Sequence, residues 1–168
     1  MLTDKRIKEA QSSFNSYLQD GLVAKKKEFE QRIFNILENN ANESLKIAEM
    51  LFANRDSWLW TIVTSYYSMY YIANAVLYKM GYKAGTHLAT ICVLCKECLG
   101  KTLERKDIEN ISAILELSEE EIKEMGRAKE RREKASYSGS VSFEKHLAEM
   151  TLDDARKFIN KMADILES

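Results

Sequence analysis

The chain has 168 residues, a formal net charge of −1, six glycines and no proline. An average composition would include about 5% proline, and strands and turns depend on both proline and glycine, so the composition excludes a strand-rich fold and predicts an all-α protein. The near-zero charge provides no basic field over the whole molecule, so any nucleic-acid site must be a local patch.

The length suits a single domain with a substantial hydrophobic core. The opening residues MLTDKR contain no apolar run, so they give no sign of a signal peptide. Three cysteines are an odd count, which favours free thiols and a cytoplasmic location.

Residues 1–42 are predicted to form a helical extension that packs on a bundle domain made by residues 43–168. Thr3 can cap a first helix that ends before Gly21. A second helical segment is expected to begin near Leu22.

Three asparagines, which are weak helix formers, occur within NNAN at residues 39–42. They allow either a short turn or an irregularity within one long helix. The helical period resumes after them and continues to about residue 54.

The stretch at residues 57–80 is predicted to be the central helix of the bundle. No charged residue occurs between Asp56 and Lys79. A surface helix would show a charged face, so this one should be surrounded by other helices, with Ser57 as its cap. Its hydroxyl and amide side chains argue against a membrane span, so no membrane partner is expected.

Two stripes run along this helix at helical spacing. Tyr67, Tyr71, Asn74 and Tyr78 fall within about 60° of one another. Such tyrosines can stack the bases of a single-stranded nucleic acid, although they more often form core contacts. The second stripe is small or hydroxylic and would let a neighbouring backbone approach closely: Ser57, Thr61, Thr64, Ser68 and Ala75.

A turn is expected at residues 81–85, followed by a helix that Thr86 can cap. His87 lies in the first turn of that helix, where a histidine more often packs than catalyses. Cys92, Cys95 and Cys98 form a C-x-x-C-x-x-C pattern without a fourth cysteine, so they are expected to be buried side chains. No metal or other cofactor is predicted.

Three further helices are expected, at residues 107–117, at 118–136, and from about 142 to the end. Thr151 could begin a separate piece of the last helix. The prediction is a single up-and-down helical bundle of six or seven helices.

Arg132 interrupts the apolar face of the helix at residues 118–136. No acidic residue stands three or four positions from it, so a guanidinium turned inward needs an anion from another helix, another subunit or a bound phosphate. The alternative is an arginine whose stem packs while its head reaches solvent. Arg131 and Lys134 add positive charge next to it.

Three sequence features together resemble the HEPN domain pattern: SYYSMYYIA at residues 65–73, Gly81 with the following His87, and REKASY at residues 132–137. The resemblance covers roughly residues 43–166. It implies a helical bundle that forms a homodimer and acts in a toxin–antitoxin or defence system.

The nuclease members of this family carry R-x(4–6)-H and cleave RNA without metal. Arg132 matches the arginine, whereas Tyr137 stands in place of the histidine, and a phenol with a pKa near 10 is a poor base at neutral pH. The match is closer to a non-nuclease branch with R-x-x-A-D-Y, although Ser136 occupies the aspartate position.

The sequence therefore predicts a HEPN-like nucleotide- or RNA-binding module with weak or no nuclease activity. Arg132 and Tyr137 would form the site, with Arg131, Lys134 and Ser136 beside them. One alternative is a metal-independent endoribonuclease toxin in which Tyr137 replaces the histidine. Another is a non-catalytic dimerisation or adaptor domain. The expected partners are a second copy of the chain, a nucleotidyltransferase-type antitoxin, and RNA or a nucleotide.

Overall fold

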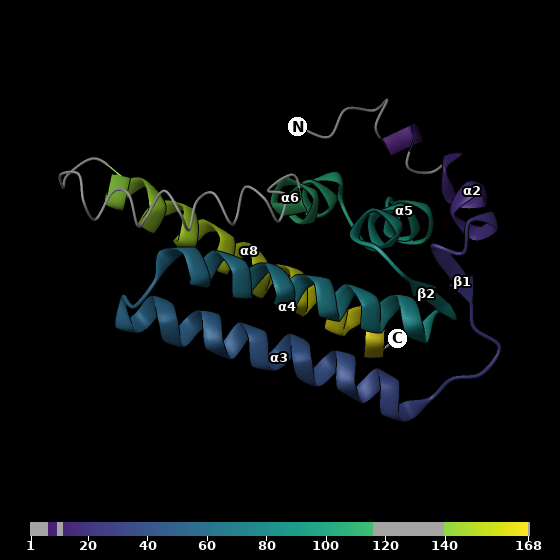
Figure 1. The fold of residues 1–168 in the computed structure, drawn as a ribbon, viewed down its shortest axis with the longest axis horizontal. Helices are drawn as coiled ribbons and strands as arrows, with labels where there is room; N and C mark the ends of the chain where they lie inside the picture. The colour runs from purple at the N-terminus through teal and green to yellow at the C-terminus, as the bar shows by residue number, and fades with distance from the viewer. Residues whose placement is uncertain (1–6, 10–11, 116–139, 168) are drawn as a thin grey trace.

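The computed structural model describes residues 7–9, 12–115 and 140–167 (Figure 1). A short antiparallel pair joins β1 (Val23–Lys25) to β2 (Tyr82–Ala84). All other named elements in these ranges are helices, which confirms the all-α bundle: α2 (Phe14–Gln19), α3 (Gln31–Asn54), α4 (Trp58–Lys79), α5 (His87–Glu97), α6 (Arg105–Leu115) and α8 (Ser140–Glu167).

Helix α4 is the centre of the bundle, as its lack of charge predicts. It lies between α3 on one side and α5 and α6 on the other, with α8 behind it in Figure 1. Ser57 caps it as expected, since the Trp60 backbone N–H donates to Ser57 Oγ at 3.3 Å. None of the helices in the described ranges is long and apolar enough to cross a membrane.

Small residues are fully buried on both α3 and α4. Thr61, Ser68 and Ala75 are fully buried on α4, and Ala41 and Ala48 are fully buried on α3. These two helices share the most extensive packing among the described elements. The small stripe is therefore buried, and its role as the surface that lets α3 approach stays a prediction.

Two local expectations are wrong. The segment after Leu22 forms β1 instead of a helix, and the turn at residues 81–85 contains β2. Gly21 ends α2 with a left-handed φ of 72°, and the chain then runs beside the segment that follows α4. Backbone bonds extend the pairing at both ends, from Lys26 N–H to the Gly81 carbonyl at 2.7 Å and from Gly85 N–H to the Leu22 carbonyl at 2.8 Å.

Two long helices are continuous where the sequence left alternatives open. Helix α3 passes through residues 39–42 without a turn. Helix α8 passes through Thr151, whose hydroxyl donates to the Leu147 carbonyl at 2.8 Å instead of capping a new helix. The proposed boundary at residues 42–43 falls within α3 and stays a prediction.

The N-terminal residues contribute to the core. Phe14 is buried edge-on against Tyr82, with ring centroids 5.8 Å apart, and Lys96 Nζ lies 3.5 Å from the centre of its ring. Val23 is also buried in the main core cluster. Residues 14–25 therefore pack on α5 and β2 as part of the same hydrophobic core.

Candidate functional site

The residues that the sequence assigns to the site lie outside the described ranges, so their roles stay predictions: Arg131, Arg132, Lys134, Ser136 and Tyr137. The structure describes the two helices that flank their segment. Helix α6 ends at Leu115 and α8 begins at Ser140.

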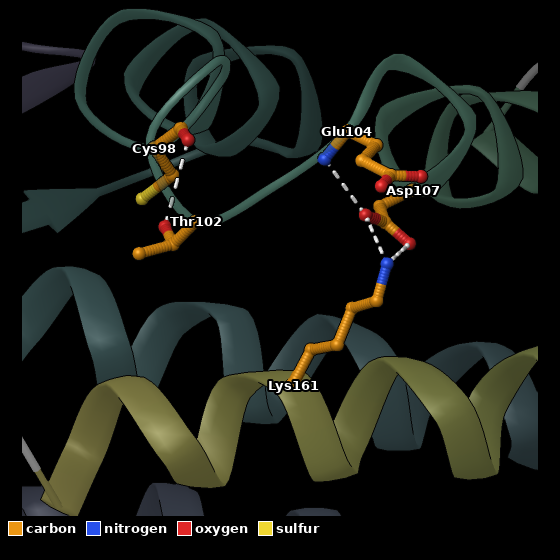
Figure 2. A network of polar contacts seen from close by, with 5 residues as sticks. All are labelled: Cys98, Thr102, Glu104, Asp107 and Lys161. Carbon is orange, nitrogen blue, oxygen red and sulfur yellow. Dashed lines mark hydrogen bonds and ion pairs between the residues drawn. The ribbon is translucent and has the colours of Figure 1, made fainter.

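Asp107 and Lys161 hold α6 against α8 (Figure 2). Lys161 Nζ donates to both carboxylate oxygens of Asp107, at 2.9 and 2.8 Å, and the Glu104 backbone N–H donates to Asp107 Oδ2 at 2.8 Å. The same carboxylate thus caps the start of α6 and accepts from α8. The hydrogen bond to Asp107 raises the pKa of Lys161. The two helices that flank the predicted site are fixed to each other at this point.

Four tyrosines of α4 and one histidine of α5 form a cluster of rings. The centroids of Tyr66 and Tyr70 are 6.3 Å apart, and those of Tyr67 and Tyr71 are 6.0 Å apart, each pair stacked along one turn of the helix. The His87 ring stands edge-on 4.3 Å from Tyr70 and 5.5 Å from Tyr66. The expected packing of His87 is confirmed.

Thr86 positions His87 in this cluster. Its hydroxyl accepts from the Ala89 backbone N–H at 3.2 Å and caps α5, as predicted. The neighbouring Thr90 hydroxyl lies 3.4 Å from the Asn74 amide oxygen, and the Asn74 amide nitrogen donates to the Tyr70 carbonyl at 2.9 Å. Polar contacts between α4 and α5 therefore fix the histidine against the tyrosines.

Burial keeps the phenols of this cluster protonated. It raises the pKa of Tyr66 far above its ordinary value, and the neighbouring Tyr70 and Tyr67 add to the shift. Burial also raises the pKa of Tyr70, although hydrogen bonds with Thr90 and Asn74 act in the opposite direction. At neutral pH these groups can donate hydrogen bonds or stack, but they cannot act as bases.

The tyrosine stripe of α4 is divided between surface and core. Tyr67 is 36% exposed, and Trp60, seven residues before it, is 56% exposed. Tyr71 is half-buried beside Tyr67. Tyr78 is buried, because Phe29 packs on its ring at 5.7 Å and the Glu30 N–H donates to its hydroxyl at 3.3 Å. One end of the stripe is thus available for contacts and the other belongs to the core.

The three cysteines are buried thiols, as expected. Burial raises the pKa of Cys95 to about 12, and it raises the pKa of Cys92 and of Cys98 as well. A protonated thiol is a poor metal ligand and a poor nucleophile. In the part of the chain that the structure describes, no group of histidine, cysteine or acidic side chains could hold a metal ion.

Sequence reasoning missed the joining of His87 to Tyr66 and Tyr70. The i, i+4 spacing of the tyrosines and the Thr86 cap were both visible in the sequence. The contact between the helices depends on how α5 packs on α4, and the residue pattern of a single helix does not predict that packing.

A comparison with models of known families identifies a family that covers most of the chain. The HEPN domain family matches residues 35–166, which runs from the first turns of α3 to the end of α8. A search of curated proteins found no match.

Proposed function

Since the chain belongs to the HEPN domain family, we propose that it is a nucleotide- or RNA-binding module of a toxin–antitoxin or defence-type system, with weak or no nuclease activity of its own. The observation that carries the proposal is the extent of the match. Residues 35–166 include both the aromatic helix α4 and the REKASY segment at 132–137. Family membership therefore applies to both features together.

Within this proposal, Arg132 contacts a phosphate of the ligand and Tyr137 donates a hydrogen bond to it. Arg131 and Lys134 add positive charge, and Ser136 offers a further hydroxyl. A phenol in the place of a histidine cannot take a proton from a ribose hydroxyl at neutral pH, which is why little cleavage is expected.

The described surface of α4 supports separate sites for the bases and for the phosphates of the ligand. Trp60 and Tyr67 present exposed aromatic side chains on which bases can stack. Helix α4 carries no charge before Lys79, so its surface offers phosphates no ionic contact. The phosphate contacts would have to come from a cationic segment such as the one that contains Arg132.

RNA binding by the full chain tests the proposal. We expect a labelled single-stranded RNA to bind with an affinity that falls as salt rises, and Arg132→Ala to weaken binding about tenfold. Fluorescence anisotropy measures both, and circular dichroism checks that helicity is unchanged. Lys157→Ala removes an exposed cation from α8 and is the matched control. Absence of any RNA or nucleotide affinity at low salt would leave the adaptor alternative standing.

The endoribonuclease alternative is tested by incubating RNA with a high concentration of the protein in EDTA. We expect the RNA to stay intact. Cleavage that disappears in Tyr137→Phe would replace the binding proposal with the nuclease alternative.

We further propose that the protein is a homodimer in the cytoplasm, paired with a nucleotidyltransferase-type antitoxin. HEPN domains commonly form dimers, which supports the first part. A nucleotidyltransferase-like reading frame beside this one, whose product co-purifies with this chain after co-expression, would support the second.

A further inference from the structure

The outer side of α3 carries an exposed apolar stripe. The fully buried Ala41 and Ala48 mark the side of α3 that packs on α4, and Glu49 accepts from Arg156 of α8 at 2.9 Å. At 100° per residue, six positions spaced three and four apart run along the outer flank of α3, between about 60° and 180° from the direction of Ala41 and Ala48, and Arg32 and Asn54 lie on the same flank. We call the six positions the α3 seam: Ile33, Ile36, Asn40, Glu43, Ile47 and Met50.

Four of the six seam residues are exposed in the described structure, and Ile33 and Asn40 are half-buried. Ile36 is 47% exposed, Ile47 is 36% exposed and Met50 is 54% exposed. In Figure 1, α3 forms an edge of the bundle, and α4 and α8 lie to one side of it. A spacing of three and four residues is the pattern by which one helix pairs with another. The seam therefore has the form of a helix-pairing surface that none of the described elements covers.

The order of residue types in the seam is the same from either end: two apolar residues, two polar residues, two apolar residues. A symmetric pair of identical subunits requires such a self-complementary surface. If two copies of α3 cross antiparallel about a point between residues 41 and 42, every apolar residue meets an apolar one. The contacts would be Ile33 with the partner's Met50, Ile36 with the partner's Ile47, and Asn40 with the partner's Glu43.

The two polar positions identify the partner. In the antiparallel arrangement, the Asn40 amide can donate to the carboxylate of the partner's Glu43, twice in each dimer. A parallel arrangement would place Glu43 against the partner's Glu43, where like charges repel. An acidic residue at the centre also disfavours a nucleic acid, whose phosphates are negative. A polar residue within such a stripe fixes the register of pairing.

We propose that the α3 seam is the surface through which two copies of this chain pair, antiparallel, with two Asn40–Glu43 contacts at the centre. The inference deepens the homodimer proposed above, because it assigns the interface and its register. It does not depend on RNA binding.

Sedimentation of the full chain is the first test. We expect a dimer, and we expect Ile36→Glu to raise the dissociation constant at least about a hundredfold, because it buries a charge opposite the partner's Ile47. The exposed Leu88 on α5 provides the matched control, and Leu88→Glu should leave the dimer unchanged. A monomeric wild type would contradict the dimer itself. A dimer that Ile36→Glu leaves intact would contradict only the assigned interface.

Disulfide cross-linking tests the direction of pairing. Ile36 and Ile47 are eleven residues apart on one helix, about 16 Å, too far for a bond within one chain. The antiparallel register places each beside the other residue of the partner. We expect a covalent dimer from the double variant Ile36→Cys/Ile47→Cys and none from either single variant. Covalent dimers from the single variants would indicate parallel pairing and overturn the proposal. The native cysteines are buried, and the wild type is the control.

Charge at position 40 tests the central contact. Asn40→Asp places a carboxylate opposite the partner's Glu43 and should weaken the dimer about tenfold or more. Asn40→Lys places a cation there and should leave the dissociation constant unchanged or lower. The reverse order, or equal effects of the two variants, would refute the Asn40–Glu43 contact.

Discussion

Tyr66 and Tyr70 lie one turn apart in the same ring cluster, but their hydroxyl groups have different surroundings. The Tyr66 hydroxyl is buried and has no hydrogen-bond partner in the described part of the chain. The Tyr70 phenol is half-buried, and hydrogen bonding from Thr90 and Asn74 counteracts the rise that burial causes in its pKa. Burying a hydroxyl without a partner costs free energy, whereas a bonded one contributes to stability. The two residues therefore form a matched pair for substitution.

We expect Tyr66→Phe to leave the free energy of unfolding unchanged or to raise it by up to about 1 kcal/mol. Tyr70→Phe should lower it by about 1 kcal/mol, because Thr90 and Asn74 lose a partner. Urea denaturation followed by circular dichroism measures both changes. Equal destabilisation by the two variants would indicate that the Tyr66 hydroxyl is bonded in solution.

Because of the buried thiols, the free energy of unfolding should depend on pH in the alkaline range. Their folded pKa values are raised, so above the ordinary thiol pKa of about 8.5 the unfolded chain releases protons that the folded chain keeps. The contribution of the thiols to stability is therefore fully present below that pH and is lost as the pH rises above it. The fall is at most about 1.4 kcal/mol for each thiol and pH unit.

We expect the free energy of unfolding to decrease between about pH 8.5 and 10, and the slope to be smaller in Cys95→Ala. Urea denaturation across this range measures the slope, which can be compared even if the variant is less stable throughout. Native thiols should also react slowly with a thiol reagent until urea unfolds the chain. A stability that stays flat over this range would show that the thiols are accessible to water.

At the scale of single elements, Asp107 has two roles, the cap of α6 and the ion pair with α8, whereas Lys161 takes part only in the ion pair. Asp107→Ala removes the cap of α6 and the ion pair with α8, so we expect a loss of about 2 kcal/mol. Lys161→Ala leaves the cap in place and removes a partly exposed pair, so its cost should be below about 1 kcal/mol. Lys157→Ala is the control and should be close to neutral. Thermal unfolding gives this order, and a larger effect for Lys161 than for Asp107 would contradict it.

The elements that the sequence predicted well are those set by local chemistry. The hydroxyl caps at Ser57 and Thr86, the uncharged central helix and the small stripe on α4 all follow from residues close together in the chain. The pairing of β1 with β2 could not be predicted, because Val23 and Ala84 are far apart in sequence and the strands are only three residues long. The contact of His87 with Tyr70 was also missed, because it depends on how α5 packs on α4 and not on residues within one helix.

For the whole molecule, the continuity of α3 determines which fragments can fold. The first half of α3 packs on the core through Phe34, Leu37 and Ala41. A fragment of residues 31–168 keeps this helix whole, whereas a fragment of residues 43–168 divides it. We expect cooperative thermal unfolding from the longer fragment, at a lower temperature than the full chain, and little or none from the shorter one. Cooperative unfolding of 43–168 near the temperature of the full chain would support a domain boundary at residues 42–43.

The pairing of β1 with β2 also sets an order of events during synthesis. β1 leaves the ribosome roughly sixty residues before its partner, an interval of about 3–12 s at ordinary rates of translation. During that time Val23 and Phe14 have no core to enter, whereas α3 and α4 are adjacent in the chain and can pack as soon as both have emerged. Residues 14–25 are thus made before α3 and α4 but placed after them, and a nascent chain paused before residue 84 would still expose Phe14 and Val23 to chaperones.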